Sequence, residues 1–107
     1  HNKRNNKLIM KKFLKIYNDS SGLYTLCNVS DIRFVTVSSS NPTTITQLYY
    51  NVLNTGIDQI NITHGSDPLG LNTNAIVAAI KEVSSKGYTN SFIEVKLPVA
   101  VTSISNG

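Results

Sequence analysis

The sequence contains few of the residues that most often carry chemistry. Its 107 residues include one cysteine and no tryptophan, and charged residues make up only 15% of the chain. The single cysteine, Cys27, cannot form an internal disulfide, and one thiol does not make a zinc or redox motif. We therefore expect a reducing compartment, no metal ion and no cofactor.

Long hydrophobic runs are also missing. No stretch approaches the roughly 20 consecutive apolar residues that a membrane-spanning helix needs. The basic N-terminus is not followed by the apolar run of a signal peptide. The sequence therefore predicts no transmembrane segment, no signal peptide and no membrane partner.

The net charge of +4 comes from one end of the chain. Six of the ten basic residues lie within the first fifteen positions, and from residue 16 onward four basic residues face six acidic ones. The body of the protein is therefore near neutral, which argues against a broad nucleic-acid-binding surface. Because the chain opens on His1 and residues 1–10 are polar, basic and aperiodic, we interpret them as a disordered basic leader or upstream read-through.

Residues 11–107 are the right length for a single β-rich domain with its own core. Abundant Ser, Thr and Asn among Ile, Val and Leu favour strands and turns. Alternating apolar and polar residues predict strands at 12–17, 23–29, 32–38, 43–52 and 58–64. The buried side of the fourth strand stays open, because both of its sides carry a tyrosine.

The hydrophobic period then changes from two to about 3.6, which predicts one helix over about residues 73–86. Asn72 or Thr73 is expected to cap its start, and Lys86 and Gly87 suit its end. The apolar stripe expected to face the protein consists of Ile76, Ala79, Ile80 and Val83.

A further alternating segment follows the helix, from Ile93 to Val101, and Pro98 places it at a sheet edge or bends it. The predicted fold class is therefore α+β. We expect a small antiparallel β-sheet or partly open barrel of six to seven strands, with one helix packed on it between the fifth and sixth strands.

One loop brings His64, Ser66 and Asp67 together in sequence. Three residues on one short turn rarely point at a single reacting atom. We therefore interpret His64 as continuing the buried side of its strand, and Ser66 and Asp67 as forming turn or helix-cap hydrogen bonds. With Asp58 the loop still lacks the ligand spacing of a calcium or zinc motif, so the sequence predicts no enzyme and no catalytic residue.

The aromatic residues are compatible with two kinds of binding surface. A protein-interaction surface would use the tyrosines at positions Tyr17, Tyr24, Tyr49 and Tyr50. Stacking of single-stranded nucleic acid would use the same rings beside the basic residues Lys11, Lys12, Lys15 and Arg33. Against the second, we expect the aromatics to fill and rim the core, and the N-terminal lysines to keep an edge strand soluble.

The layout of residues 11–104 resembles the short β-rich virion structural proteins of tailed phages, particularly those of marine and aquatic bacteria. The matching segments are Lys12–Ile16, Thr44–Thr46, Ile60–His64, Asn74–Ile80 and Glu94–Ile104. These are framework residues, so no catalytic residue is implied. The resemblance implies a multi-copy capsid decoration or tail-associated protein in the virion, and in the host cytoplasm during assembly, whose partners are copies of itself or other virion proteins.

Overall fold

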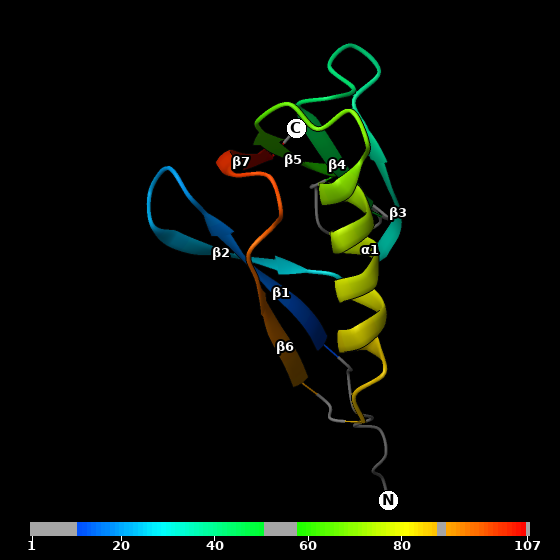
Figure 1. The fold of residues 1–107 in the computed structure, drawn as a ribbon. Coiled ribbons are helices and arrows are strands. Elements are labelled where there is room, and N and C mark those ends of the chain that lie inside the picture. The colour runs from blue at the N-terminus through cyan, green and yellow to red at the C-terminus, as the bar shows by residue number, and fades with distance from the viewer. Residues whose placement is uncertain (1–10, 51–57, 88–89, 107) are drawn as a thin grey trace, which may run out of the picture.

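The computed structural model describes residues 11–50, 58–87 and 90–106, which form seven strands and one helix (Figure 1). In chain order the elements are β1 (Lys11–Asn18), β2 (Leu23–Asn28), β3 (Ile32–Val37), β4 (Ile45–Tyr50), β5 (Gln59–His64), α1 (Leu71–Ser84), β6 (Asn90–Val95) and β7 (Val101–Asn106). The predicted α+β class, with its helix between the fifth and sixth strands, is confirmed. The expected leader at residues 1–10 lies outside the described residues.

The strands divide between two sheets. A three-stranded sheet has the order β2-β1-β6, and a four-stranded sheet has the order β3-β4-β5-β7. All pairs are antiparallel except β1 and β6, which run parallel. A parallel pair needs a long crossover connection, and here the chain between β1 and β6 forms β2, β3, β4, β5 and α1.

The β1–β2 hairpin forms where the sequence predicts it. The side-chain oxygen of Asn18 accepts hydrogen bonds from the amides of Ser20 and Ser21, and its carbonyl oxygen accepts one from Gly22. Gly22 has a φ of 75°, a left-handed conformation that favours glycine. The turn therefore follows from Asn and Gly at these positions.

Pro98 divides the last predicted strand into two. The segment from Ile93 to Val101 is not one strand, because β6 ends at Val95 and β7 begins at Val101. The two strands belong to different sheets, and Pro98, which has no amide hydrogen, lies in the connection between them. The expected bend is therefore a change of sheet.

The core lies where α1 packs against β1, β3 and β6 and extends between the sheets. Ile76, Ala79 and Val83 of the predicted helical stripe are buried, and Ile80 is half-buried. On β4, Thr46 and Leu48 are fully buried, which settles the face that the sequence left open. The other buried apolar residues are Leu14, Ile16, Cys27, Val29, Ile62, Leu97 and Val101.

The helix begins two residues earlier than predicted, and neither Asn72 nor Thr73 caps it. Gly70 stands at the N-cap position with a φ of 70°, and the Asp67 carboxylate accepts hydrogen bonds from the amides of Leu71 and Asn72, both at 2.8 Å. The Asn72 side chain instead pairs with the backbone amide and carbonyl of Val99. The cap prediction was wrong because the side-chain amide of Asn72 is buried, where it holds the β6–β7 connection against the helix.

Candidate functional site

The His64 loop lies between β5 and α1. His64 is buried, as its strand position predicts, and its Nδ1 donates to the carbonyl oxygen of Gly65 at 2.8 Å. Its Nε2 lies 2.9 Å from the hydroxyl of Thr46, which in turn lies 3.2 Å from the hydroxyl of Thr73. Because a carbonyl only accepts, Nδ1 carries a proton, and in the neutral ring Nε2 accepts from Thr46. These hydrogen bonds join β4, β5 and the start of α1.

The three polar residues of this loop do not converge. Both oxygens of Asp67 are taken by helix amides, and both ring nitrogens of His64 are hydrogen-bonded elsewhere. Ser66 is exposed. Within the described ranges, no group of three or more His, Cys, Asp or Glu side chains is placed to hold a metal ion. The interpretation of His64 and Asp67 as packing and capping residues is therefore confirmed.

Two titratable groups lie inside the protein near each other. Burial raises the pKa of the Cys27 thiol to about 11. Burial also raises the pKa of Tyr50 well above its usual range, and the nearby Cys27 and Asp31 raise it further. The Tyr50 hydroxyl is shielded from solvent and has no hydrogen-bond partner among the described residues. Both groups therefore carry their proton at neutral pH.

The outer side of the three-stranded sheet is the strongest candidate for a functional surface. Because Leu14 and Ile16 of β1 point into the core, the alternate residues of this strand point outward. Neighbouring residues on β2 and β6 share that side through the strand register. We call this surface the aromatic sheet face; it consists of Phe13, Lys15, Tyr17, Tyr24, Leu26, Asn28, Phe92, Glu94 and Lys96.

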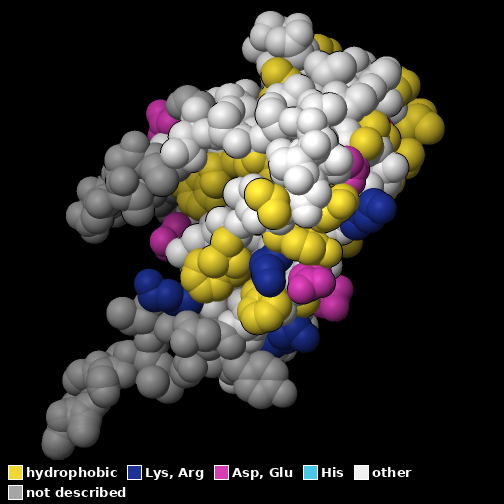
Figure 2. Space-filling view, turned by 90° about the vertical axis from the view of Figure 1, so that its left-hand side faces the viewer, with side chains coloured by type: hydrophobic (Ala, Val, Ile, Leu, Met, Phe, Trp, Pro, Cys, Tyr) yellow, Lys and Arg dark blue, Asp and Glu magenta, His cyan; other side chains and the backbone are white. Residues whose placement is uncertain are grey.

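Large apolar side chains on this face are exposed rather than packed. Tyr24 is 44% exposed, Leu26 58% and Phe92 55%. Figure 2 views the molecule from this side and shows hydrophobic side chains gathered around basic and acidic ones. Exposed apolar clusters of this kind mark interaction surfaces in folded proteins.

Lys15 lies at the centre of the aromatic sheet face. Its ammonium lies 5.6 Å from the ring centroid of Tyr24 and 5.1 Å from that of Phe92, and 3.7 Å from a carboxylate oxygen of Glu94. Tyr17 and Tyr24 contact each other at a centroid distance of 5.2 Å, and the Lys96 ammonium lies 5.5 Å from the Tyr17 ring. The two ammonium groups thus lie within cation–π distance of three aromatic rings on this surface.

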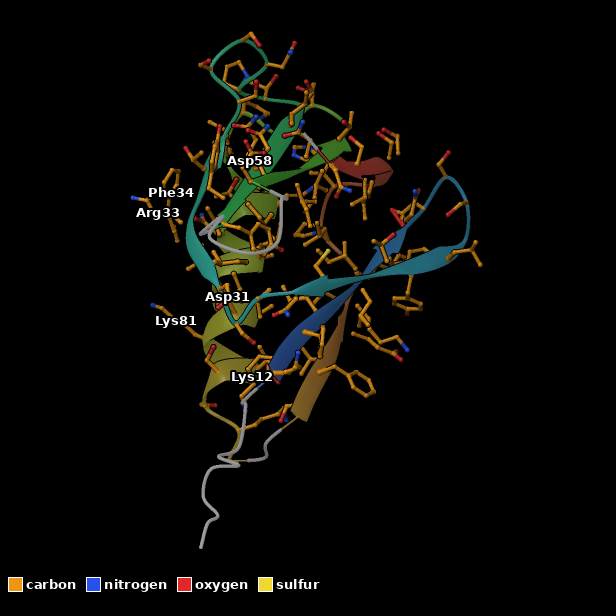
Figure 3. All side chains as sticks on the ribbon, turned by 180° about the vertical axis from the view of Figure 1, so that it is seen from behind. Lys12, Asp31, Arg33, Phe34, Asp58 and Lys81 are labelled. Carbon is orange, nitrogen blue, oxygen red and sulfur yellow. The ribbon has the colours of Figure 1, made fainter. Side chains whose placement is uncertain are left out.

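The structure separates the four tyrosines that the sequence grouped as one interaction surface. Tyr17 and Tyr24 lie on the aromatic sheet face, whereas Tyr50 points inward. Tyr49 lies on the outer side of the four-stranded sheet, stacked on Phe34 at a centroid distance of 4.7 Å. Figure 3 shows Phe34 and Arg33 pointing outward from β3.

The basic residues proposed for nucleic-acid contact are likewise not one group. Lys15 lies on the aromatic sheet face, Lys11 is exposed on the same strand, and Arg33 lies on β3. Lys12 is buried, and its ammonium donates to the carbonyl oxygen of Lys86 at 2.7 Å, so it is not available to a phosphate. The expected edge strand is also wrong, since β1 lies between β2 and β6.

Sequence reasoning missed Phe92, Glu94 and Lys96 as members of this face. A signal was present, since these residues alternate with Ile93 and Val95 in the last predicted strand. What the pattern did not provide was the parallel pairing of β6 with β1, which places Phe92 beside Phe13 and Glu94 beside Lys15. Long-range parallel pairing leaves no local mark in a sequence.

Comparison with protein-family models, curated proteins and solved structures gave no significant match. In the described part of the chain, no helix is long and apolar enough to cross a membrane. Fold and surface together define an α+β domain with two sheets, one helix and an exposed aromatic sheet face.

Proposed function

We propose that this protein is a non-enzymatic interaction protein that associates with copies of itself through the aromatic sheet face. The observation that carries the proposal is the cluster of Tyr24, Leu26 and Phe92, large apolar side chains that are about half exposed on one side of the sheet. Aromatic residues are enriched at the centres of protein interfaces, because they bring large contact area at a low entropy cost.

The charges on this face suit a second copy of the chain. Lys15 and Lys96 provide positive charge beside the negative charge of Glu94. In a two-fold dimer, each patch meets its own counterpart, so a face that carries both signs can pair its lysines with the partner's carboxylate. A surface of one sign would repel itself.

A multi-copy role fits the resemblance to virion structural proteins of tailed phages. In that setting the aromatic sheet face would be the contact between neighbouring copies, or between this protein and another virion protein. The proposal places the chain in the virion and, during assembly, in the host cytoplasm.

Binding of single-stranded nucleic acid is the second candidate function, and one observation favours it. Lys15 and Lys96 lie beside the rings of Tyr17, Tyr24 and Phe92, which combines stacking platforms with phosphate-binding cations. Against it, the Glu94 carboxylate already pairs with Lys15, which lowers the positive charge available to a phosphate.

Light scattering across a protein concentration series tests the proposal. Self-association predicts that the measured molar mass rises from that of one chain, 11.7 kDa, toward a multiple of it as concentration increases. In parallel, fluorescence polarisation with a labelled oligo-dT at several salt concentrations tests the second candidate, since phosphate contacts make binding fall steeply with salt.

The two readouts separate the functions. A rising mass with no oligo-dT binding supports self-association. A constant mass at all concentrations with salt-sensitive oligo-dT binding replaces it with the nucleic-acid function, and a constant mass without such binding rejects both.

A further inference from the structure

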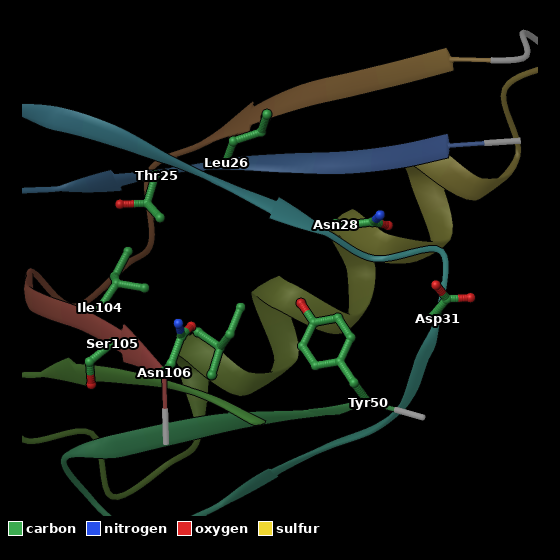
Figure 4. Close-up of a pocket in the computed structure, with 9 residues that line it drawn as sticks. Thr25, Leu26, Asn28, Asp31, Tyr50, Ile104, Ser105 and Asn106 are labelled. Atoms are coloured by element: carbon green, nitrogen blue, oxygen red, sulfur yellow. The ribbon is translucent and has the colours of Figure 1, made fainter. Parts of the chain in front are cut away.

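A cavity of about 430 Å³ lies between the two sheets, beside the edge of β2 that does not pair with β1 (Figure 4). Its volume falls within the range of ligand sites, roughly 300–1,000 Å³. The residues that line it come from both sheets and from the β2–β3 turn, and they are Thr25, Leu26, Asn28, Asp31, Tyr50, Ile60, Ile104, Ser105 and Asn106.

The cavity is bounded by the edges of two strands. Ile104, Ser105 and Asn106 are consecutive residues of β7, and Thr25 and Leu26 are consecutive residues of β2. Side chains alternate sides along a strand, so consecutive residues line one space only when the strand presents its backbone edge to it. The cavity is thus a slot between two strand edges.

Both strands end their sheets. In the described part of the chain β2 pairs only with β1, and β7 only with β5. Each strand therefore has one side without a ladder partner among the described residues. The backbone groups of Val101 are already bonded to the Asp19 carboxylate and the Ser20 amide, so the part of β7 left for another strand begins after Val101. An extended peptide is the occupant that uses such edges, because its main chain supplies matching donors and acceptors.

The side chains around the slot indicate which peptide side chains it would bind best. Ile60 and Ile104 offer an apolar lining, and Asp31 is the one charged residue among the described residues that line it. The ion pair found among the described residues joins Lys15 to Glu94, so Asp31 has no basic partner there. An incoming strand with an aliphatic side chain and a neighbouring lysine or arginine would match both features.

We propose that the slot between β2 and β7 binds an extended segment of a partner protein, held by strand pairing and by a basic side chain at Asp31. This site differs from the aromatic sheet face, although Leu26 and Asn28 border both. Peptide binding here does not require self-association.

The test uses the Phe92→Ser variant of the full chain, which weakens the aromatic sheet face and leaves the slot unchanged. Titration with acetyl-Thr-Val-Lys-Val-Thr-amide, followed by two-dimensional NMR of ¹⁵N-labelled protein, should shift the amides of residues 25–28 and 104–106. Replacing the peptide lysine by glutamate, or the protein's Asp31 by asparagine, should weaken binding about threefold, as expected for a partly exposed charge pair. Glu82→Gln, an exposed carboxylate on α1, is the matched control and should leave affinity unchanged.

A backbone-methylated form of the same peptide separates strand pairing from simple filling of the cavity. Methylation removes the amide donors, so it should abolish the shifts. Equal binding of the methylated peptide, or of butylamine alone, would show a small-molecule site and overturn the proposal. Absence of any shift at millimolar lysine peptide would overturn it as well.

Discussion

The Lys12 ammonium donates a hydrogen bond of 2.7 Å to the carbonyl oxygen of Lys86, 74 positions further along the chain. This contact joins the central strand of the three-stranded sheet, where Figure 3 labels Lys12, to the segment that follows α1. Lys86 lies two residues beyond the end of α1, so this contact holds the chain that follows the helix against the sheet. A hydrogen bond from a charged donor is stronger than one between neutral groups, so its loss from a partly buried site should destabilise the fold. A lysine that belongs by sequence to a basic N-terminus thus has a structural role.

Replacing this lysine should destabilise the fold. Lys12→Met keeps the aliphatic length but removes the charged donor, and we expect the free energy of unfolding in urea to fall by about 1–3 kcal/mol. Lys11→Met is the matched control, because its side chain is exposed, and it should change stability by less than about 0.5 kcal/mol. Equal effects of the two variants would contradict the structural role of Lys12.

The Asp67 cap should also be measurable. Asp67→Ala removes the acceptor for the amides of Leu71 and Asn72, so thermal unfolding should show a loss of about 1–2 kcal/mol. Asp67→Asn retains one acceptor oxygen and should lose less. Asp58→Ala, at an exposed aspartate before β5, should have little effect. An enzymatic role for this loop would be indicated only by a variant that unfolds normally yet loses an activity.

The unpaired hydroxyl of Tyr50 predicts a stabilising substitution. Tyr50→Phe removes a buried polar atom that has no partner among the described residues. The free energy of unfolding should therefore increase by up to about 1 kcal/mol, and the melting temperature should rise with it. Tyr49→Phe should act in the opposite direction, because the Tyr49 hydroxyl donates to the side-chain oxygen of Gln47 at 3.2 Å. A lower melting temperature for Tyr50→Phe would show that this hydroxyl is satisfied in solution.

Stability should fall in alkali because of Cys27. Its thiol pKa rises from 9.0 to about 11 on folding, so the unfolded chain loses the proton first. The contribution of the protonated Cys27 thiol to the free energy of unfolding is fully present below pH 9 and is lost as the pH rises through 11. The change is on the order of 2–3 kcal/mol. Tyr50, whose pKa is also raised, adds to the decline at still higher pH.

The Cys27→Ala variant isolates this effect. Its unfolding free energy should be lower at neutral pH because of the cavity it leaves, but it should decline less between pH 9 and pH 11 than that of the parent chain. Curves that run parallel through this window would show that burial does not perturb the thiol.

Much of the fold follows from local sequence pattern. The alternation of Leu14 and Ile16, the Asn18–Gly22 turn and the stripe from Ile76 to Val83 each predict their element correctly. The division into two sheets does not follow, because it depends on β6 pairing with β1 and β7 pairing with β5 across most of the chain. Pro98 signalled a bend, but no local feature says which sheet each half joins.

The candidate surface was predicted only in part, for the same reason. Tyr17 and Tyr24 pair within one hairpin, so their joint exposure is a local property. Phe92 and Lys96 reach the same face through the parallel strand. Lys12 was assigned to the surface because charged residues are usually exposed, yet here the carbonyl oxygen of Lys86, just beyond α1, accepts a hydrogen bond from its ammonium.

Sedimentation equilibrium of two matched variants tests whether the chain associates through the aromatic sheet face. Phe92→Ser and Phe34→Ser each remove a phenylalanine that is about half exposed beneath a cation, one on the aromatic sheet face and one on the four-stranded sheet. We expect Phe92→Ser to weaken self-association at least tenfold and Phe34→Ser to associate like the parent chain, since truncating an aromatic side chain at the centre of an interface typically costs ~1.4 kcal/mol or more. Unchanged association in Phe92→Ser, or an equal loss in both variants, would contradict it.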